Sequence, residues 1–195
     1  MSAIVGRDEE LASLRAFIDE MREGPAALVL EGEAGIGKSA LWLAGVEHAR
    51  TRGFRLLSSR PAEAERGLAH VGLGDLFEDV LDEVLPALPP PRQRALEVAL
   101  LLEEATDEAV DPHALGIATR GGLQVLAGEK PLLVAIDDLQ WFDPSSAHAL
   151  AFALRRLATR NVLLLVAERV ATRQGARESN RCSTRSESGI SRSGR

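Results

Sequence analysis

The feature that most constrains this chain is the segment Gly-Glu-Ala-Gly-Ile-Gly-Lys-Ser at residues 32–39. An apolar run typical of a buried strand, Ala26 to Leu30, comes before it, and a helical stretch, Ala40 to Ala49, follows it. Glycines let the backbone of such a loop wrap around a polyphosphate, and the next helix presents its free N–H groups to the same anion. A glycine-rich turn that matches by chance would not need this order of elements. The sequence therefore predicts a strand, a phosphate-binding loop and a helix, in a chain that binds a nucleoside triphosphate.

Two side chains of the loop have individual expected roles. Lys38 would reach the β- and γ-phosphates as a point charge, and the Ser39 hydroxyl would bind Mg²⁺. The residues expected to contact the nucleotide are Gly32, Glu33, Ala34, Gly35, Ile36, Gly37, Lys38, Ser39 and Ala40.

A second apolar run, Leu132 to Ile136, ends in two carboxylates. At the tip of a strand, Asp137 can hold Mg²⁺ beside Ser39. Asp138 can then orient or deprotonate an attacking water molecule, as a general base does in hydrolysis. Two acids after an apolar run also fit a solvated helix start, but the phosphate-binding loop upstream favours the interpretation as a nucleotide site.

Several segments resemble one family. The sequence Asp-Asp-Leu-Gln-Trp-Phe-Asp-Pro-Ser-Ser at 137–146 resembles the D-D-x-x-W-x-D-P-x-[ST] signature of STAND-type ATPases, which are AAA-type modules known from large LuxR-family transcriptional regulators. Residues 4–11, Ile-Val-Gly-Arg-Asp-Glu-Glu-Leu, are similar to the V-G-R-[DE]-x-E box that opens these modules, and the phosphate-binding loop has the family's usual wording. Segments 59–65 and 71–76 are similar to the stretch after the family's second strand, so the resemblance covers roughly residues 4–169.

The resemblance implies further roles. It places Val5 and Arg7 on the adenine side of the nucleotide, and Arg169 as a sensor that touches the γ-phosphate and stabilises its charge. It implies a nucleotide switch that binds ATP or ADP with Mg²⁺, hydrolyses ATP slowly, and associates with copies of itself according to nucleotide state. The expected catalytic set is Lys38, Asp138 and Arg169, and the expected metal ligands are Ser39 and Asp137.

Strands and helices alternate along the chain, which predicts an α/β fold of the P-loop NTPase type, a three-layer α/β/α sandwich with a mainly parallel sheet. The predicted strands are 26–30, 54–58, 132–136 and 162–167. The predicted helices are 7–22, 38–52, 63–85, 92–104, 112–127 and 144–159, with a rigid proline-rich loop at 86–91. Trp42 is expected in the core.

Composition fits a cytoplasmic globular domain. Of the 195 residues, 45% are hydrophobic, and the single cysteine excludes an internal disulfide framework. No apolar run approaches the length of a membrane span. The net charge is −6, and an acidic body argues against direct binding of nucleic acid by this domain.

The last 25 residues differ from the rest. Segment 171–195 holds six of the 23 basic residues but only two of the 29 acids, and it has no apolar periodicity. We expect an ATPase domain at 1–170 and a disordered basic tail at 171–195. The tail is either a basic arm for anionic partners or non-native sequence at the end of a truncated or frame-shifted gene.

The sequence is also compatible with two other functions. One is a nucleotide-binding fragment that does not hydrolyse ATP because it lacks the family's lid. The other is a small-molecule phosphotransferase built on the same loop. GTP is disfavoured as the nucleotide because the chain contains no N-K-x-D guanine box.

Overall fold

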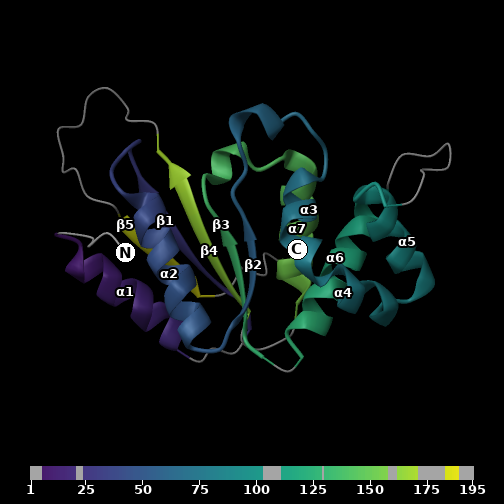
Figure 1. Cartoon of the computed structure of the whole chain (residues 1–195), viewed down its shortest axis with the longest axis horizontal. Helices are drawn as coiled ribbons and strands as arrows, with labels where there is room; N and C mark the ends of the chain where they lie inside the picture. Colours follow the sequence, from purple (N-terminus) through teal and green to yellow (C-terminus); the bar gives the residue numbers. More distant parts are fainter. Residues whose placement is uncertain are drawn as a thin grey trace, which may run out of the picture.

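The computed structural model describes residues 6–20, 24–102, 111–128, 130–157, 162–170 and, through their backbone, 183–188. Within these residues the sheet has five strands in the order β2-β3-β4-β1-β5 (Figure 1). They are β1 (Ala26–Gly32), β2 (Arg55–Ser59), β3 (Leu132–Ile136), β4 (Val162–Arg169) and β5 (Ser183–Ser188). The first four run parallel, and β5 pairs antiparallel with β1.

Helices cover both faces of the sheet (Figure 1). The helices α1 (Asp8–Asp19) and α2 (Lys38–Thr51) lie on one face. On the other side lie α3 (Val71–Phe77), α4 (Leu81–Ala87), α5 (Pro90–Ala99), α6 (Pro112–Leu126) and α7 (Pro144–Arg156). Short 3₁₀ turns occur at η1 (Glu63–Glu65), η2 (Glu78–Val80) and η3 (Leu139–Trp141). The predicted three-layer α/β/α sandwich with a mainly parallel sheet is confirmed.

Strand β3 lies in the interior of the sheet, between β2 and β4, and all five of its side chains are buried. Leu133 and Ala135 pack in the hydrophobic cluster beneath α1 and α2. The alternate residues Leu132, Val134 and Ile136 pack in the cluster on the side of α3–α7. Successive side chains of a strand point to opposite faces, so a strand covered on both faces must be apolar at every position. The bounds of β3 therefore match the apolar run read from the sequence.

Residues 63–85, predicted as one helix, instead form η1, α3, η2 and α4. His70 adopts a left-handed conformation before α3, and Val80 lies outside the helical region before α4. The prediction of a loop at 86–91 is also wrong, because α4 extends through Pro86 and α5 begins at Pro90. Proline is well suited to the first turn of a helix, where its missing N–H would have no partner.

The segment predicted to be a disordered tail contributes β5. Its backbone pairs with β1 from Ala26 opposite Ser188 to Glu31 opposite Ser183. The prediction for 171–195 is therefore corrected at these six positions, and the rest of that segment lies outside the described residues. An edge strand can form from a polar sequence because the partner strand supplies the backbone hydrogen bonds.

A buried carboxylate, Asp143, ties α3 to α7. It caps α7 by accepting a hydrogen bond from the backbone N–H of Ser146 at 2.9 Å, and it accepts two more from the N–H groups of His70 and Gly72 at 2.9 and 3.0 Å. Burial raises the pKa of Asp143, but the hydrogen bonds from Ser146, Gly72 and His70 outweigh it and hold the pKa below its ordinary value. The residue that caps α7 thus also fixes the start of α3.

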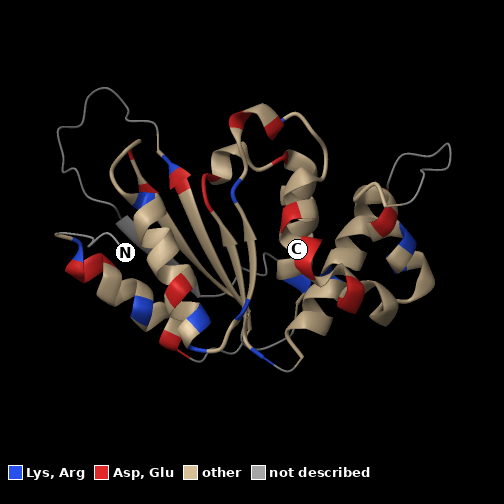
Figure 2. Cartoon of the chain, in the orientation of Figure 1, with Lys and Arg blue, Asp and Glu red and all other residues tan. Residues whose placement is uncertain are grey.

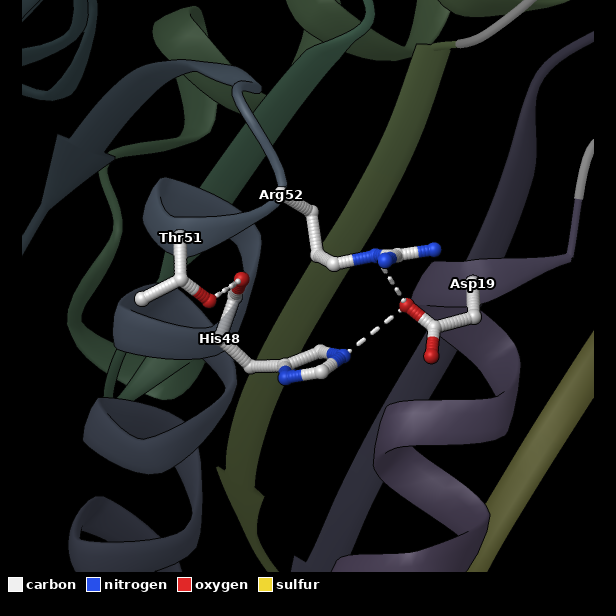
Figure 3. A network of polar contacts seen from close by, with 4 residues as sticks. All are labelled: Asp19, His48, Thr51 and Arg52. Carbon is white, nitrogen blue, oxygen red and sulfur yellow. Dashed lines mark hydrogen bonds and ion pairs between the residues drawn. The ribbon is translucent and has the colours of Figure 1, made fainter.

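On the opposite face, a polar cluster joins α1 to α2 (Figure 3). Asp19 near the end of α1 lies 2.9 Å from the Nε2 atom of His48 and 2.8 Å from the Nε atom of Arg52. In the same turn the Thr51 hydroxyl donates to the His48 carbonyl. The hydrogen bond with His48 is the main cause that holds the pKa of Asp19 below its ordinary value, and Arg52 adds to it.

Among the described residues, no helix is both long and apolar enough to cross a membrane.

We predict that Gly72→Ala destabilises the protein by about 1–3 kcal/mol, since overfilling a packed site costs this much. A Cβ atom at Gly72 would lie 2.2 Å from the Phe142 ring. Gly74→Ala is the matched control on the same helix, because a Cβ atom there meets nothing within 4 Å. Gly74→Ala should raise the free energy of unfolding by about 0.5–1 kcal/mol through helix propensity. Urea unfolding of both variants provides the test, and equal effects would contradict the packing explanation.

We predict that the stabilising effect of Asp19 is lost in acid. A carboxylate whose pKa is lowered by folding stabilises the fold above its unfolded pKa, near 3.9, and this stability disappears as the pH falls through the lower folded value. Asp19→Asn should therefore melt below the parent at pH 6, with the gap closing below about pH 4. Melting curves measured by circular dichroism between pH 6 and 2.5 test this. Asp82→Asn, an exposed change on α4, should show no such gap.

Candidate functional site

The predicted phosphate-binding loop connects β1 to α2. Gly35 and Gly37 have φ values of +76° and +96°, in the left-handed region that favours glycine. Gly37 is the N-cap residue of α2, and no side chain caps the helix there. The first N–H groups of α2 are therefore left for another acceptor, which is the arrangement that binds phosphate at a helix N-terminus.

Lys38 is the first residue of α2, and only 7% of it is exposed. Its Nζ atom donates to the carbonyl oxygens of Gly32 at 3.0 Å and Glu33 at 2.7 Å. These contacts hold the ammonium group against the start of the loop. A polyphosphate lying on the loop would meet a positive charge that is already positioned.

Arg7, at the N-terminus of α1, contacts the same loop. Its Nη2 atom donates to the Ile36 carbonyl at 2.7 Å, and Nη1 pairs with Glu10 at 3.2 Å. Helix α1 is thus linked to the phosphate-binding loop at this end and to α2 through Asp19 at the other. Arg7 lies next to the predicted nucleotide contacts, and its proximity to adenine stays a prediction. Val5 lies outside the described residues.

A hydrogen bond connects α2, the helix after the phosphate-binding loop, to the end of β3. The Ser39 hydroxyl donates to Oδ1 of Asp137 at 3.2 Å, across 98 positions of sequence. Asp137 is only 2% exposed, and its Oδ1 atom also accepts from the backbone N–H of Asp138 at 3.1 Å. The two residues predicted as metal ligands therefore lie side by side.

These two residues fit a magnesium ion, which prefers hard oxygen ligands and usually keeps several waters. A hydroxyl from α2 and a buried carboxylate that follows β3 supply two such oxygens in contact. The described residues contain no group of three or more His, Cys, Asp or Glu side chains that could hold a metal. Phosphate oxygens and water would complete the coordination, as in sites where Mg²⁺ arrives with a nucleotide.

Asp138, the predicted general base, is the next residue. Its φ of +51° is in the left-handed region, which non-glycine residues rarely adopt and which often marks functional sites. Its Oδ1 atom accepts from Nε2 of Gln140 at 2.7 Å. One carboxylate oxygen is therefore fixed by an amide, and the role of Asp138 as a general base stays a prediction.

Gln140 also reaches the end of β4. Its Oε1 atom accepts from the backbone N–H of Arg169 at 3.0 Å. Arg169 pairs in register with Gly32, and the N–H of Val170 donates to the Gly32 carbonyl at 3.2 Å. The Arg169 side chain is exposed beside the first residue of the loop, and its contact with a γ-phosphate stays a prediction.

The sequence interpretation missed the roles of Gln140 and Arg60. Gln140 occupies an unspecified position of the D-D-x-x-W signature, so its closeness to Asp138 along the chain was the available signal. Arg60 follows β2, and its Nη2 atom lies 3.6 Å from Oδ2 of Asp137. Acidic and basic positions thus meet at the carboxyl ends of the parallel strands, at the upper edge of the sheet in Figure 2.

A cavity of about 380 Å³ lies between α3 and the end of α5. Its lining is mostly apolar and includes Leu100, Leu101 and Leu102. Asp75 also lines it and accepts a hydrogen bond from the Ser59 hydroxyl at 2.7 Å. None of the predicted nucleotide contacts lines this cavity, so it is separate from the phosphate-binding loop.

Comparison with known proteins agrees with this geometry. The family model described as the AAA ATPase domain matches residues 3–166, which include the phosphate-binding loop and the Asp137–Asp138 pair but stop before Arg169. No curated protein matched the sequence. Since the family model covers most of the 195 residues, this chain belongs to the AAA ATPase domain family.

Proposed function

We propose that this domain is a Mg²⁺-dependent ATP-binding switch that hydrolyses ATP slowly, and that it serves a signalling or transcriptional regulator of the STAND type. The observation that carries the proposal is the Ser39–Asp137 hydrogen bond, because it brings a magnesium-binding hydroxyl and carboxylate together beside the uncapped start of α2. The family match supports nucleotide binding. The regulatory role rests on the sequence resemblance described above.

In this proposal the loop and the strand ends divide the chemistry. The N–H groups of the loop and of the first turn of α2 bind the phosphates, and Lys38 places its charge on them. Ser39 and Asp137 hold the metal, which neutralises developing charge on the phosphates when bound. Asp138, fixed by Gln140, accepts the proton of the attacking water through its Oδ2 atom.

The arrangement also suggests how hydrolysis could change the domain. Gln140 joins Asp138 to the backbone of Arg169, and β4 is joined to the loop through Gly32. Loss of the γ-phosphate would remove contacts from groups that these bonds connect. We propose that this network couples the nucleotide state to self-association of the domain.

We also propose that the domain is located in the cytoplasm. It would bind neither membranes nor nucleic acid directly.

We predict that Lys38→Ala weakens ATP binding by about 10- to 100-fold, because a charged hydrogen bond to phosphate contributes about 1.5–3 kcal/mol. Lys130→Ala is the matched control, since the chain contains only these two lysines and Lys130 precedes β3 at the opposite edge of the sheet. Calorimetry with ATP and Mg²⁺ measures both, with circular dichroism to show that each variant is folded. Equal affinity in the parent and Lys38→Ala would contradict the assignment of the loop.

We predict that Asp138→Asn keeps ATP affinity within about twofold but lowers phosphate release by at least about 100-fold, the usual contribution of a general base. Release is measured under single-turnover conditions with Mg²⁺. Binding without release in the parent itself would favour the alternative of a nucleotide-binding fragment. Transfer of phosphate to a small molecule, with little release to water, would instead favour the phosphotransferase.

A further inference from the structure

Asp137 carries a second contact that the proposed metal site does not use. Its Oδ1 atom accepts hydrogen bonds from Ser39 and from the backbone of Asp138, whereas Oδ2 faces the guanidinium of Arg60 at 3.6 Å. The register of the sheet explains the meeting. Ser59, the last residue of β2, pairs with Ile136, the last residue of β3. The residues that follow the two strands, Arg60 and Asp137, therefore also lie side by side.

Arg60 is held from a second direction. Its guanidinium lies 5.9 Å from the centre of the Trp42 ring, within the range of a cation–π contact. Trp42 is buried on α2, as expected from the sequence, and it follows Ser39 by three positions, so the two side chains are neighbours on the helix. The guanidinium thus contacts the metal-site carboxylate and the helix that carries the metal-site hydroxyl.

The contact between Arg60 and Asp137 is suited to being exchanged. A buried carboxylate needs a compensating positive charge, and Asp137 has one in Arg60. The Arg60 side chain is 62% exposed, however, and 3.6 Å is longer than a hydrogen bond, so water screens the pair and makes it weak. A divalent ion bound to the same carboxylate would replace the guanidinium readily.

We propose that Arg60 is a positioning residue that serves as the exchangeable counterion of Asp137, and that Arg60 and Mg²⁺ occupy this carboxylate in alternation. This inference rests on the proposed function, because it assigns Mg²⁺ to Ser39 and Asp137. Arg60 compensates the charge of this buried carboxylate in the absence of the metal. Arrival of Mg²⁺ with the nucleotide moves the guanidinium away from Asp137 and changes the environment of the Trp42 ring.

The test compares Arg60→Gln with Arg66→Gln, which removes the same charge from an exposed arginine a few residues further along the chain. Calorimetry measures ADP affinity for the parent and both variants, once with Mg²⁺ and once with EDTA. Arg60 competes with Mg²⁺ and not with the nucleotide. Arg60→Gln should therefore raise the ADP affinity measured with Mg²⁺ by about 2- to 5-fold, the range expected for a weak exposed ion pair. It should leave the affinity in EDTA unchanged, and Arg66→Gln should change neither.

Tryptophan fluorescence gives a second readout that does not depend on hydrolysis. In a Trp141→Phe background Trp42 is the only indole, since the chain has two tryptophans. Adding Mg²⁺ with ADP should shift its emission in the parent and in Arg66→Gln, and the shift should be smaller in Arg60→Gln. ADP with EDTA is the control for effects of the nucleotide alone.

Three results would overturn the inference. If Arg60→Gln weakens ADP binding with and without Mg²⁺, Arg60 is a phosphate ligand and not a counterion. If Arg60→Gln and Arg66→Gln give the same Mg²⁺ dependence as the parent, Arg60 does not compete with the metal. Absence of ADP binding in the folded parent would overturn the proposed function itself, and this outcome is distinct because it does not depend on either arginine.

Discussion

The hydrogen bond between Ser39 and Asp137 is the contact on which the candidate site depends. It forms because β1, β3 and β4 run parallel, which places the ends of all three strands at one edge of the sheet. Asp137 is buried there, so the carboxylate must be compensated by donors and charge from neighbouring segments. The Ser39 hydroxyl, the Asp138 backbone N–H and the Arg60 guanidinium supply that compensation, so three segments meet at one acid.

The helical layers hold this edge in place by two different means. On the side of α3–α7, buried Asp143 satisfies backbone N–H groups of α3 and α7 together, and Gly72 allows the Phe142 ring to lie against α3. On the other side, α1 is fastened by exposed charges at Asp19 and by the contact of Arg7 with the loop. Removing a buried acceptor leaves donors without partners, whereas the exposed pairs are screened by water. Loss of the Asp143 acceptor would therefore cost more than loss of the exposed pairs at Asp19.

Sequence interpretation was accurate where one local pattern had one structural solution. The apolar run 132–136 gave the bounds of β3, and glycines before Lys38 gave the loop, whose positive φ angles at Gly35 and Gly37 explain the residue choice. It failed between 63 and 85, where helical periodicity could not show that Asp143, far along the chain, accepts the N–H groups that start α3. It also failed at 183–188, because pairing with an edge strand needs little from the side chains.

The sequence by itself determined the phosphate-binding loop, the acids at the end of β3 and the layered α/β fold, since each is encoded by residues adjacent along the chain. Only the tertiary structure decided that Gln140 joins Asp138 to β4 and that Arg60 faces Asp137. These contacts link residues through the order and register of the strands. That order is set by how both faces of the sheet are buried, and no local stretch of sequence contains this information.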